Sequence, residues 1–277
     1  MRPGSLATDP AAALRERLCA VRWEVLRTDH AAGAYNMALD AALLSAAAAE
    51  AIPPTLRFYG WSPPAVSLGR FQRPDGIALA AASARGWELV RRPTGGRAVL
   101  HDRELTYSLV LPPSVLQNAG VRTSYAVLVG CLNAGLRRLL GSAAAESPAP
   151  GTCGGRARAA NCFALPGECD TLVPEGKLVG SAQVRRDGAL LQHGSLLLDA
   201  DRGAWSALFG EPGRLVTLAD LLGAPPHPDA AAAALLSGFA AAGIRFREQP
   251  LPEPLERAAL SSAAEYVLPV ASDRTLQ

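Results

Sequence analysis

Cys162 and Lys177 could together supply the chemistry of a cysteine nucleophile. A free cysteine has a pKa of about 8.5, so little of it is thiolate near neutral pH, and a nearby ammonium raises that fraction. Lys177 is the only lysine among 27 basic residues, all others being arginine. Because an ammonium is compact and shifts its pKa when buried, it supplies what a guanidinium cannot. We therefore predict a cysteine nucleophile with a lysine partner; a buried, inert cysteine and a lysine kept by drift are the alternatives.

The remaining cysteines give no sign of a metal centre or a redox pair. The chain has five cysteines, an odd number, and no C-x-x-C spacing, so we expect free thiols. Cys19 and Cys131 fall on helix-like segments and suit burial. Cys153 and Cys169 are loop cysteines that stay candidates beside Cys162.

A diglycine joins two strand-like runs in the segment Arg91 to Asp102. Without Cβ atoms, Gly95 and Gly96 let the backbone approach a ligand closely and point N–H groups at a carbonyl or phosphate. A plain hairpin turn is the alternative. The residues around the turn favour a binding loop over a plain hairpin turn; they are Arg92, Thr94, Arg97 and His101.

Two further runs, Lys177 to Gln183 and Leu191 to Ser195, bring small and polar residues together. In a meander these runs lie side by side, and small residues there leave room for a bound chain. The candidates are Gly180, Ser181, Ala182, Gln183, His193 and Gly194. His101 and His193 have no ligand spacing with other metal-binding residues, so we predict no metal site. Both are expected either to hydrogen-bond in the site wall or to be structural.

The elements that must position these residues can be read from the hydrophobic pattern. Strand-like runs cover Thr55–Tyr59, Ala65–Leu68, Trp87–Arg91 and Leu105–Leu111, and Thr171–Asp199 is typical of a three-stranded meander. Helices are predicted from an Asn36 cap to about Glu50, over Thr123–Leu140 ending at Gly141, and over Ala230–Ala242 with Asp229 as cap, followed by an edge strand at Ile244–Arg247. Strands arriving in runs indicate the α+β class and a single domain. We divide the chain into an N-terminal extension (1–22), a catalytic domain (23–250) and a C-terminal tail (251–277).

Composition excludes several classes of protein. Hydrophobic residues make up 49% and charged residues 19% of the 277, which is ordinary for a globular enzyme and too apolar for disorder. The formal charge of +2 is spread thinly, so we predict no nucleic-acid partner. No run approaches the roughly 18 apolar residues of a membrane span, and no targeting signal is visible. We expect a cytoplasmic monomer.

The ordered set of motifs resembles the biotin and lipoate protein ligase superfamily, and within it the LipM type of octanoyltransferase. The resemblance extends from about Trp23 to Asp199. Its motifs are Gly33–Asp40, Leu56–Trp61, Ser67–Gln72, Thr94–Asp102, Glu104–Ser108 and Gly176–Asp199.

This resemblance implies a curved mixed β-sheet flanked by helices, with an acyl chain bound beside the diglycine loop. It implies octanoyl transfer from acyl carrier protein to a lysine of a lipoyl-domain protein, such as glycine cleavage H protein, without a cofactor. Cys162 falls where the family has its acyl-carrying cysteine, and Lys177 matches the lysine that lowers the pKa of that cysteine. Thioester to amide is downhill, so ATP is not required.

Three other functions fit parts of the pattern. An ATP-dependent lipoate protein ligase shares the diglycine loop and the lysine, but it needs no cysteine. An amidotransferase that moves octanoyl between lipoyl domains also uses a cysteine, although its diglycine loop lacks the Arg97 to Asp102 pattern. An acyl-binding or docking module without catalysis would form no covalent adduct.

Overall fold

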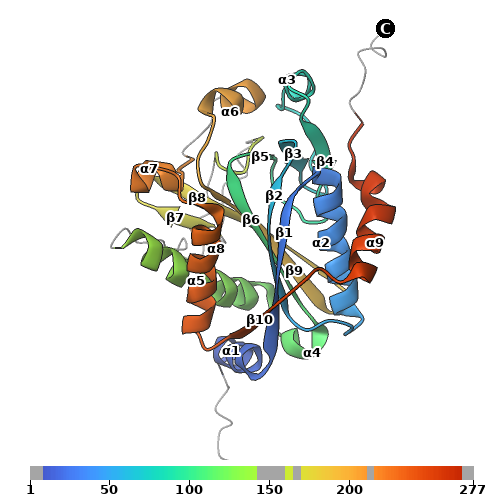
Figure 1. Cartoon of the computed structure of the whole chain (residues 1–277), viewed down its shortest axis with the longest axis vertical. Helices are drawn as coiled ribbons and strands as arrows, with labels where there is room; N and C mark the ends of the chain where they lie inside the picture. The colour runs from blue at the N-terminus through green and yellow to red at the C-terminus, as the bar shows by residue number, and fades with distance from the viewer. Residues whose placement is uncertain (1–8, 142–159, 165–169, 211–214, 270–277) are drawn as a thin grey trace, which may run out of the picture.

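A seven-stranded mixed sheet forms the centre of the protein (Figure 1). The structure is a computed structural model that describes residues 9–141, 160–164, 170–210 and 215–269. The strand order is β10-β1-β2-β6-β9-β8-β7; β10, β1 and β2 run parallel, and the remaining neighbours are antiparallel. The strands are β1 (Arg22–Ala31), β2 (Thr55–Trp61), β6 (Glu104–Leu111), β7 (Thr171–Val173), β8 (Gly176–Arg186), β9 (Ala189–Leu197) and β10 (Arg245–Gln249).

A second sheet of three strands, in the order β4-β3-β5, was not expected as a separate unit. Its strands are β3 (Ala65–Leu68), β4 (Glu88–Arg91) and β5 (Val99–His101). The diglycine lies between β4 and β5, so this small sheet carries the predicted binding loop. The predicted meander is confirmed as β7, β8 and β9.

Helices cover both faces of the large sheet (Figure 1). The first face is packed by α1 (Pro10–Ala20), α5 (Val121–Leu140) and α8 (Pro228–Ala241), and the second by α2 (Gly33–Ala48) and α9 (Glu253–Ser262). Shorter helices are α3 (Leu79–Ser83), α4 (Pro113–Leu116), α6 (Arg202–Phe209) and α7 (Leu218–Leu222), with a 3₁₀ turn at Ala263–Tyr266. This arrangement confirms the α+β class with a mixed sheet flanked by helices. Within the part of the chain that the structure describes, no helix is long and apolar enough to cross a bilayer.

Two predicted helix caps are wrong, for different reasons. Helix α2 begins at Gly33, and the Asn36 side chain is buried inside it, where it donates to the carbonyl oxygens of Ala31 (3.2 Å) and Gly60 (2.9 Å). The Asn36 side-chain amide is thus used in tertiary hydrogen bonds instead of capping the helix. Helix α8 is capped by the His227 side chain, two residues before the predicted Asp229, and His227 accepts from the Asp229 backbone N–H. The predicted end of α5 at Gly141 is confirmed, with φ at +68°.

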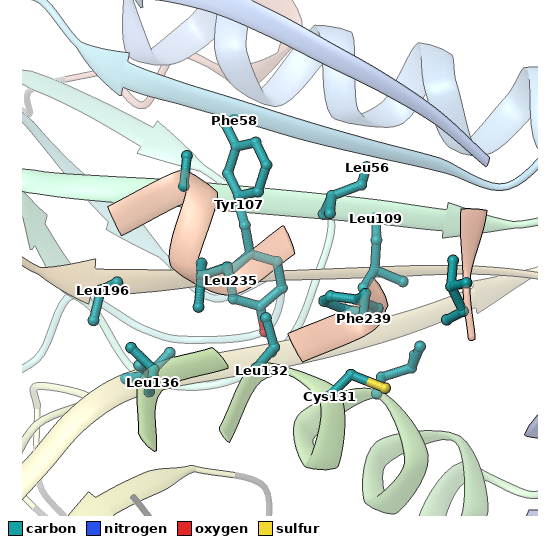
Figure 2. Close-up of a cluster of buried hydrophobic side chains, with 14 of the residues drawn as sticks. Leu56, Phe58, Tyr107, Leu109, Cys131, Leu132, Leu136, Leu196, Leu235 and Phe239 are labelled. Carbon is teal, nitrogen blue, oxygen red and sulfur yellow. The ribbon is translucent and has the colours of Figure 1, made fainter. Parts of the chain in front are cut away.

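Alternation along β6 separates the apolar core from the site. Leu105, Tyr107, Leu109 and Leu111 belong to the core under α5 and α8, and successive side chains of a strand point to opposite faces. Figure 2 shows Tyr107 and Leu109 among Leu132, Leu235 and Phe239 of these helices. The even-numbered residues of β6, which include Glu104, Thr106 and Ser108, are buried on the opposite face.

Helices outside the predicted catalytic domain pack on the same body. Helix α1 buries Leu14 and Leu18 in the core under α5 and α8, and α9 buries Ala259 beside α2. The domain boundaries at 22/23 and 250/251 stay predictions.

Asp40 of α2 is the centre of a buried polar network that fixes α2 to the sheet. It is fully buried, and its carboxylate accepts hydrogen bonds from Arg57 (2.9 Å), Tyr59 (2.9 Å), Ser108 (2.7 Å) and His193 (2.9 Å). Burial would raise the pKa of Asp40, but the His193 hydrogen bond and the Arg57 charge hold that pKa below its ordinary value. A buried ion pair of this kind costs about 3–5 kcal/mol when one partner is removed, so the network constrains the fold strongly.

His193 connects this network to the diglycine loop. Its Nδ1 lies 2.9 Å from Asp40 Oδ2, and its Nε2 lies 2.6 Å from Thr94 Oγ1. Because an ionised carboxylate only accepts, Nδ1 carries the proton, and the Thr94 hydroxyl can donate to Nε2 of the neutral ring. Burial lowers the pKa of His193, and the charges of Arg92 and His101 lower it further, while Asp40 opposes the shift.

We predict that His193 makes the fold sensitive to mild acid. Its pKa in the folded protein lies below the unfolded value of about 6.5, so its contribution to stability is present above about pH 6.5 and is lost as the pH falls below it. The free energy of unfolding, measured by urea denaturation, should therefore fall between about pH 7.5 and pH 5.5. His193→Gln should be less stable at the higher pH and should lose most of this dependence. His227→Gln, at an exposed histidine, should keep the native profile; an unchanged slope in His193→Gln would contradict the assignment.

Candidate active site

A cavity of about 430 Å³ lies where the two sheets meet. Eight of the predicted acyl-binding residues line it, namely Arg92, Gly96, His101, Gly180, Ser181, Ala182, His193 and Gly194. Cys162 also lines it, together with residues that the sequence did not single out: Met37, Tyr59, Trp61, Ser67, Val99, Thr106 and Ser195.

Cys162 and Lys177 meet at the wall of this cavity. Lys177 Nζ lies 3.1 Å from Cys162 Sγ and donates to the Cys162 carbonyl oxygen at 2.8 Å. Lys177 also forms an ion pair with Asp170, with 2.6 Å between Nζ and Oδ2. Cys162 is half-buried, whereas the Lys177 side chain is only 3% exposed. The predicted pair is thus adjacent in space, and Asp170 is a partner that the sequence did not reveal.

The electrostatics of the site keep Lys177 charged. Burial alone would lower the pKa of Lys177, but the charges of Cys162 and Asp170 outweigh it and raise that pKa above its ordinary value. Arg92 adds a second buried cation, and burial lowers its pKa to about 10, with the Cys162 charge opposing the shift. The arrangement thus places the Cys162 sulfur beside a cation at the wall of the cavity.

Local packing holds the cysteine in place. The Cys162 backbone N–H donates to the Ala98 carbonyl oxygen at 2.8 Å, which ties its loop to the start of β5. Phe163 packs edge-on against Trp205 at 5.5 Å, and the Lys177 ammonium lies 5.2 Å from the centre of the Phe163 ring. Cys153 and Cys169 lie outside the described residues.

Gly180 leaves room for the contact between Cys162 and Lys177. A Cβ atom at this position of β8 would come within 3.2 Å of both Cys162 Sγ and Lys177 Cε. Gly194 of β9 pairs with Ser181, and a Cβ there would lie 2.7 Å from the Tyr107 ring and 2.6 Å from the Gly180 carbonyl oxygen. Gly180 thus leaves space for the nucleophile and its partner, whereas Gly194 lets β9 pack closely against Tyr107 and β8.

Arg92 holds the diglycine loop in its shape. Its guanidinium donates to the carbonyl oxygens of Gly95 (2.8 Å) and Arg97 (2.7 Å) and to Ser67 Oγ (3.0 Å). Gly96 has φ at +95°, and a Cβ there would lie 2.8 Å from Arg92 Nη2. Thr94, Gly95 and Arg97 do not line the cavity; they shape the loop that does.

A second polar cluster, around His101, forms another part of the cavity wall. His101 Nε2 lies 2.7 Å from Ser67 Oγ, and its Nδ1 lies 2.9 Å from Glu104 Oε1. The Trp61 ring stacks on His101, with 3.8 Å between centroids and 13° between planes. Trp61 is held in turn by a 2.7 Å bond from its indole N–H to Thr106 Oγ1. The even-residue alternation of β6 was the signal in the sequence that could have identified Glu104 and Thr106.

Gln183 lies away from the cavity. Its side chain donates to Gln192 (2.8 Å) and accepts from Ser124 of α5 (3.2 Å). It supports the hairpin from the α5 side. Among the described residues, no group of three or more His, Cys, Asp or Glu side chains could hold a metal ion.

Comparison with known proteins identifies the family of the chain. The lipoyl protein ligase A/B catalytic domain matches residues 32–240. An octanoyltransferase LipM from Kyrpidia tusciae is 41% identical over 266 residues, which cover 88% of this chain and 96% of that protein. Another, from Symbiobacterium thermophilum, is 39% identical and covers 86% of this chain and 92% of that protein.

Solved structures show the same fold. A lipoate-protein ligase A bound with ATP superposes with a TM-score of 0.71 at 25% identity, covering 88% of this chain and 94% of that one. A bi-partite lipoate protein ligase from Thermoplasma acidophilum gives a TM-score of 0.68 at 25% identity, covering 88% and 93%. The chain therefore belongs to the lipoyl protein ligase A/B catalytic domain family, and the relatives that it matches over most of its length are octanoyltransferases of the LipM type.

Proposed function

We propose that this protein is an octanoyltransferase of lipoate biosynthesis that carries the octanoyl group on Cys162. The observation that supports the route most directly is the 3.1 Å contact between Lys177 Nζ and Cys162 Sγ at the wall of the cavity. The relatives named octanoyltransferase LipM, at 41% and 39% identity, support the activity. A ligase that only activates an acid with ATP has no need of a thiol at this position.

The proposed reaction has two half-reactions. The Cys162 thiolate attacks the carbonyl carbon of an octanoyl thioester, the carbon–sulfur bond of the donor breaks, and the donor leaves as a thiol after taking up a proton. Backbone N–H groups beside the cavity steady the oxyanion. The neutral amine of an acceptor lysine then attacks the Cys162 thioester. An amide forms, the thiolate returns to Lys177, and the surplus amine proton passes to solvent.

The partners follow from this chemistry. The donor is octanoyl-acyl carrier protein, and the acceptor is a lipoyl-domain protein such as glycine cleavage H protein. A relative in fold was solved as part of an archaeal lipoylation system with its E2 lipoyl domain, which supports an acceptor of this class. The cytoplasmic location and the monomeric state stay predictions.

The covalent intermediate provides the first test. Incubation with octanoyl-acyl carrier protein, without ATP, should add one octanoyl group, and hydroxylamine should remove it because thioesters react readily with amines. Intact mass spectrometry measures the adduct. Cys162→Ala should form none, whereas Cys19→Ala, at a cysteine far from the cavity, should behave as the native protein. Ligation only when ATP and free octanoate are supplied would instead establish the ATP-dependent ligase, and binding without any adduct would establish a docking module.

A second prediction concerns the choice of lysine. The ammonium reaches three acceptors within 3.1 Å in a site with 3% exposure, whereas a guanidinium is longer and planar and holds its N–H donors in a fixed fork that does not match these acceptors. Lys177→Arg should therefore fold but should form the thioester at least about a hundredfold more slowly, a loss of roughly 2.7 kcal/mol. Rapid-quench mass spectrometry measures the rate. Near-native formation would show that charge alone suffices.

The cavity also predicts the chain length that it accepts. It extends from Gly180 on β8 to Trp61 on β2, and these strands are separated by β9 and β6. At about 4.8 Å between neighbouring strands, the span is about 14 Å, which suits a medium-length acyl chain. Met37 of α2 lies at the β2 end with Tyr59 and Trp61.

Met37→Ala should therefore shift the preference toward longer chains, because it adds room at the closed end. Competition among hexanoyl, octanoyl, decanoyl and dodecanoyl thioesters, read by mass spectrometry, should show several-fold more decanoyl adduct than the native protein. Leu44→Ala removes a buried side chain of the same helix outside the cavity. It should lower stability similarly and leave the preference unchanged. An equal shift in both variants would contradict this placement of the chain end.

A further inference from the structure

Asp170 shares the Lys177 ammonium with Cys162. The ammonium has three donors, and they face Asp170 Oδ2 (2.6 Å), Cys162 Sγ (3.1 Å) and the Cys162 carbonyl oxygen (2.8 Å). The side chains of Asp170 and Lys177 are 5% and 3% exposed. Asp170 is not among the residues that line the cavity, so it contacts Lys177 rather than the bound acyl chain.

The charges around Lys177 change during the proposed reaction. Before acylation the ammonium faces two anions, the Cys162 thiolate and the Asp170 carboxylate. Once the sulfur carries an acyl group, it is neutral, and among the described residues Asp170 is the remaining anion in contact with the ammonium. The other groups described near it do not compensate the charge, because the Cys162 carbonyl and the Phe163 ring are neutral and Arg92 is a second cation. A buried cation without an anionic partner is strongly disfavoured and tends to lose its proton.

We infer that Asp170 is a positioning residue that keeps the Lys177 ammonium charged and directed at the sulfur while Cys162 carries the acyl group. The inference rests on the proposed function. In the second half-reaction the acceptor nitrogen bonds to the carbonyl carbon, the carbon–sulfur bond breaks, and the electron pair goes to sulfur. An ammonium already in place stabilises that leaving thiolate, whereas a neutral amine would not.

The sheet register places Asp170 for this role. It immediately precedes β7, in which Leu172 pairs with Lys177 and Thr171 pairs with Val179. Its other carboxylate oxygen, Oδ1, accepts from the Ser181 backbone N–H at 3.4 Å. The carboxylate is thus held by β8 on one oxygen and by the ammonium on the other.

The single lysine of this chain allows a direct test that does not depend on acyl transfer. Labelling with [¹³Cε]lysine gives one side-chain signal, whose titration follows Lys177 alone. Cys162→Ala reproduces the missing thiolate of the acylated state. In that background, Asp170→Asn should move the titration to lower pH by at least about two units, because burial is no longer opposed. Asp170→Glu should restore most of the shift, and Asp187→Asn, at the exposed turn between β8 and β9, should cause none.

The same signal can be followed in the native protein, which does not require the Asn variant to fold. After acylation by octanoyl-acyl carrier protein, the Lys177 signal at about pH 8 should still be that of a protonated ammonium. A neutral amine in the acylated native protein, or an unchanged titration in Cys162→Ala/Asp170→Asn, would overturn the inference.

A kinetic measurement separates positioning from a loss of structure. The rate at which octanoyl-enzyme transfers to a lipoyl-domain protein is measured for Asp170→Asn and divided by the native rate at each pH. The ratio of the variant rate to the native rate should fall at least about tenfold between pH 6.5 and pH 8.5, because Lys177 of the variant loses its proton in this range. Ionisation of the acceptor lysine affects both rates equally, so it does not change the ratio. A ratio that is low but independent of pH would indicate a structural role and contradict the inference. Failure of the native protein to form octanoyl-enzyme would refute the proposed function, while the lysine titration would still decide the role of Asp170.

Discussion

The buried Lys177 ammonium imposes the strictest constraint on this protein. A cation with 3% exposure must be matched by acceptors, and the fold supplies a carboxylate, a sulfur and a carbonyl within 3.1 Å. The sulfur and the carbonyl both belong to Cys162, so the two acceptor residues and the lysine come from three segments that must be held separately. Asp170 precedes β7, Lys177 lies on β8, and Cys162 is tied to the start of β5.

The requirement for space explains the glycines around this ion pair. Gly180 leaves room for the sulfur and the lysine stem, and Gly194 leaves room for the backbone and the Tyr107 ring. Both positions lie on strands that are otherwise well populated with leucine and valine. A side chain at Gly180 would press on the nucleophile and its partner, and a side chain at Gly194 would clash with the Gly180 carbonyl oxygen and the Tyr107 ring. The first glycine is therefore needed by the site and the second by the packing of the sheet.

Two buried networks connect the site to the rest of the fold. Asp40 joins α2 to β2, β6 and β9, and reaches the diglycine loop through His193 and Thr94. Arg92 joins the small sheet to the same loop through three backbone and hydroxyl acceptors. Because the loop is held from both sheets, the cavity between them has a defined shape. A defined shape is what allows a cavity to measure the length of a flexible acyl chain.

The local pattern of the sequence determined most elements of this fold. Alternation and turn residues gave β2, β3, β4, β6 and the β7–β9 meander within a residue or two, because side-chain period and turn chemistry are local properties. The same signals did not predict β1, in which polar and apolar residues are mixed, or β5, which has three residues. Both strands are recognised by the neighbouring strands with which they pair. The local signals also misplaced the start of α2, where tertiary acceptors took the Asn36 amide.

The site divides in the same way. The isolation of Lys177 among arginines and the order of the motifs pointed to the cysteine, the lysine and the diglycine loop. Only the tertiary structure decided that Asp170 pairs with Lys177, that Gln183 faces α5, and that Met37 and Trp61 line the cavity. Residue type and spacing report what a side chain can do. Which partner it meets depends on strand register and on the packing of two sheets, and no local pattern encodes these.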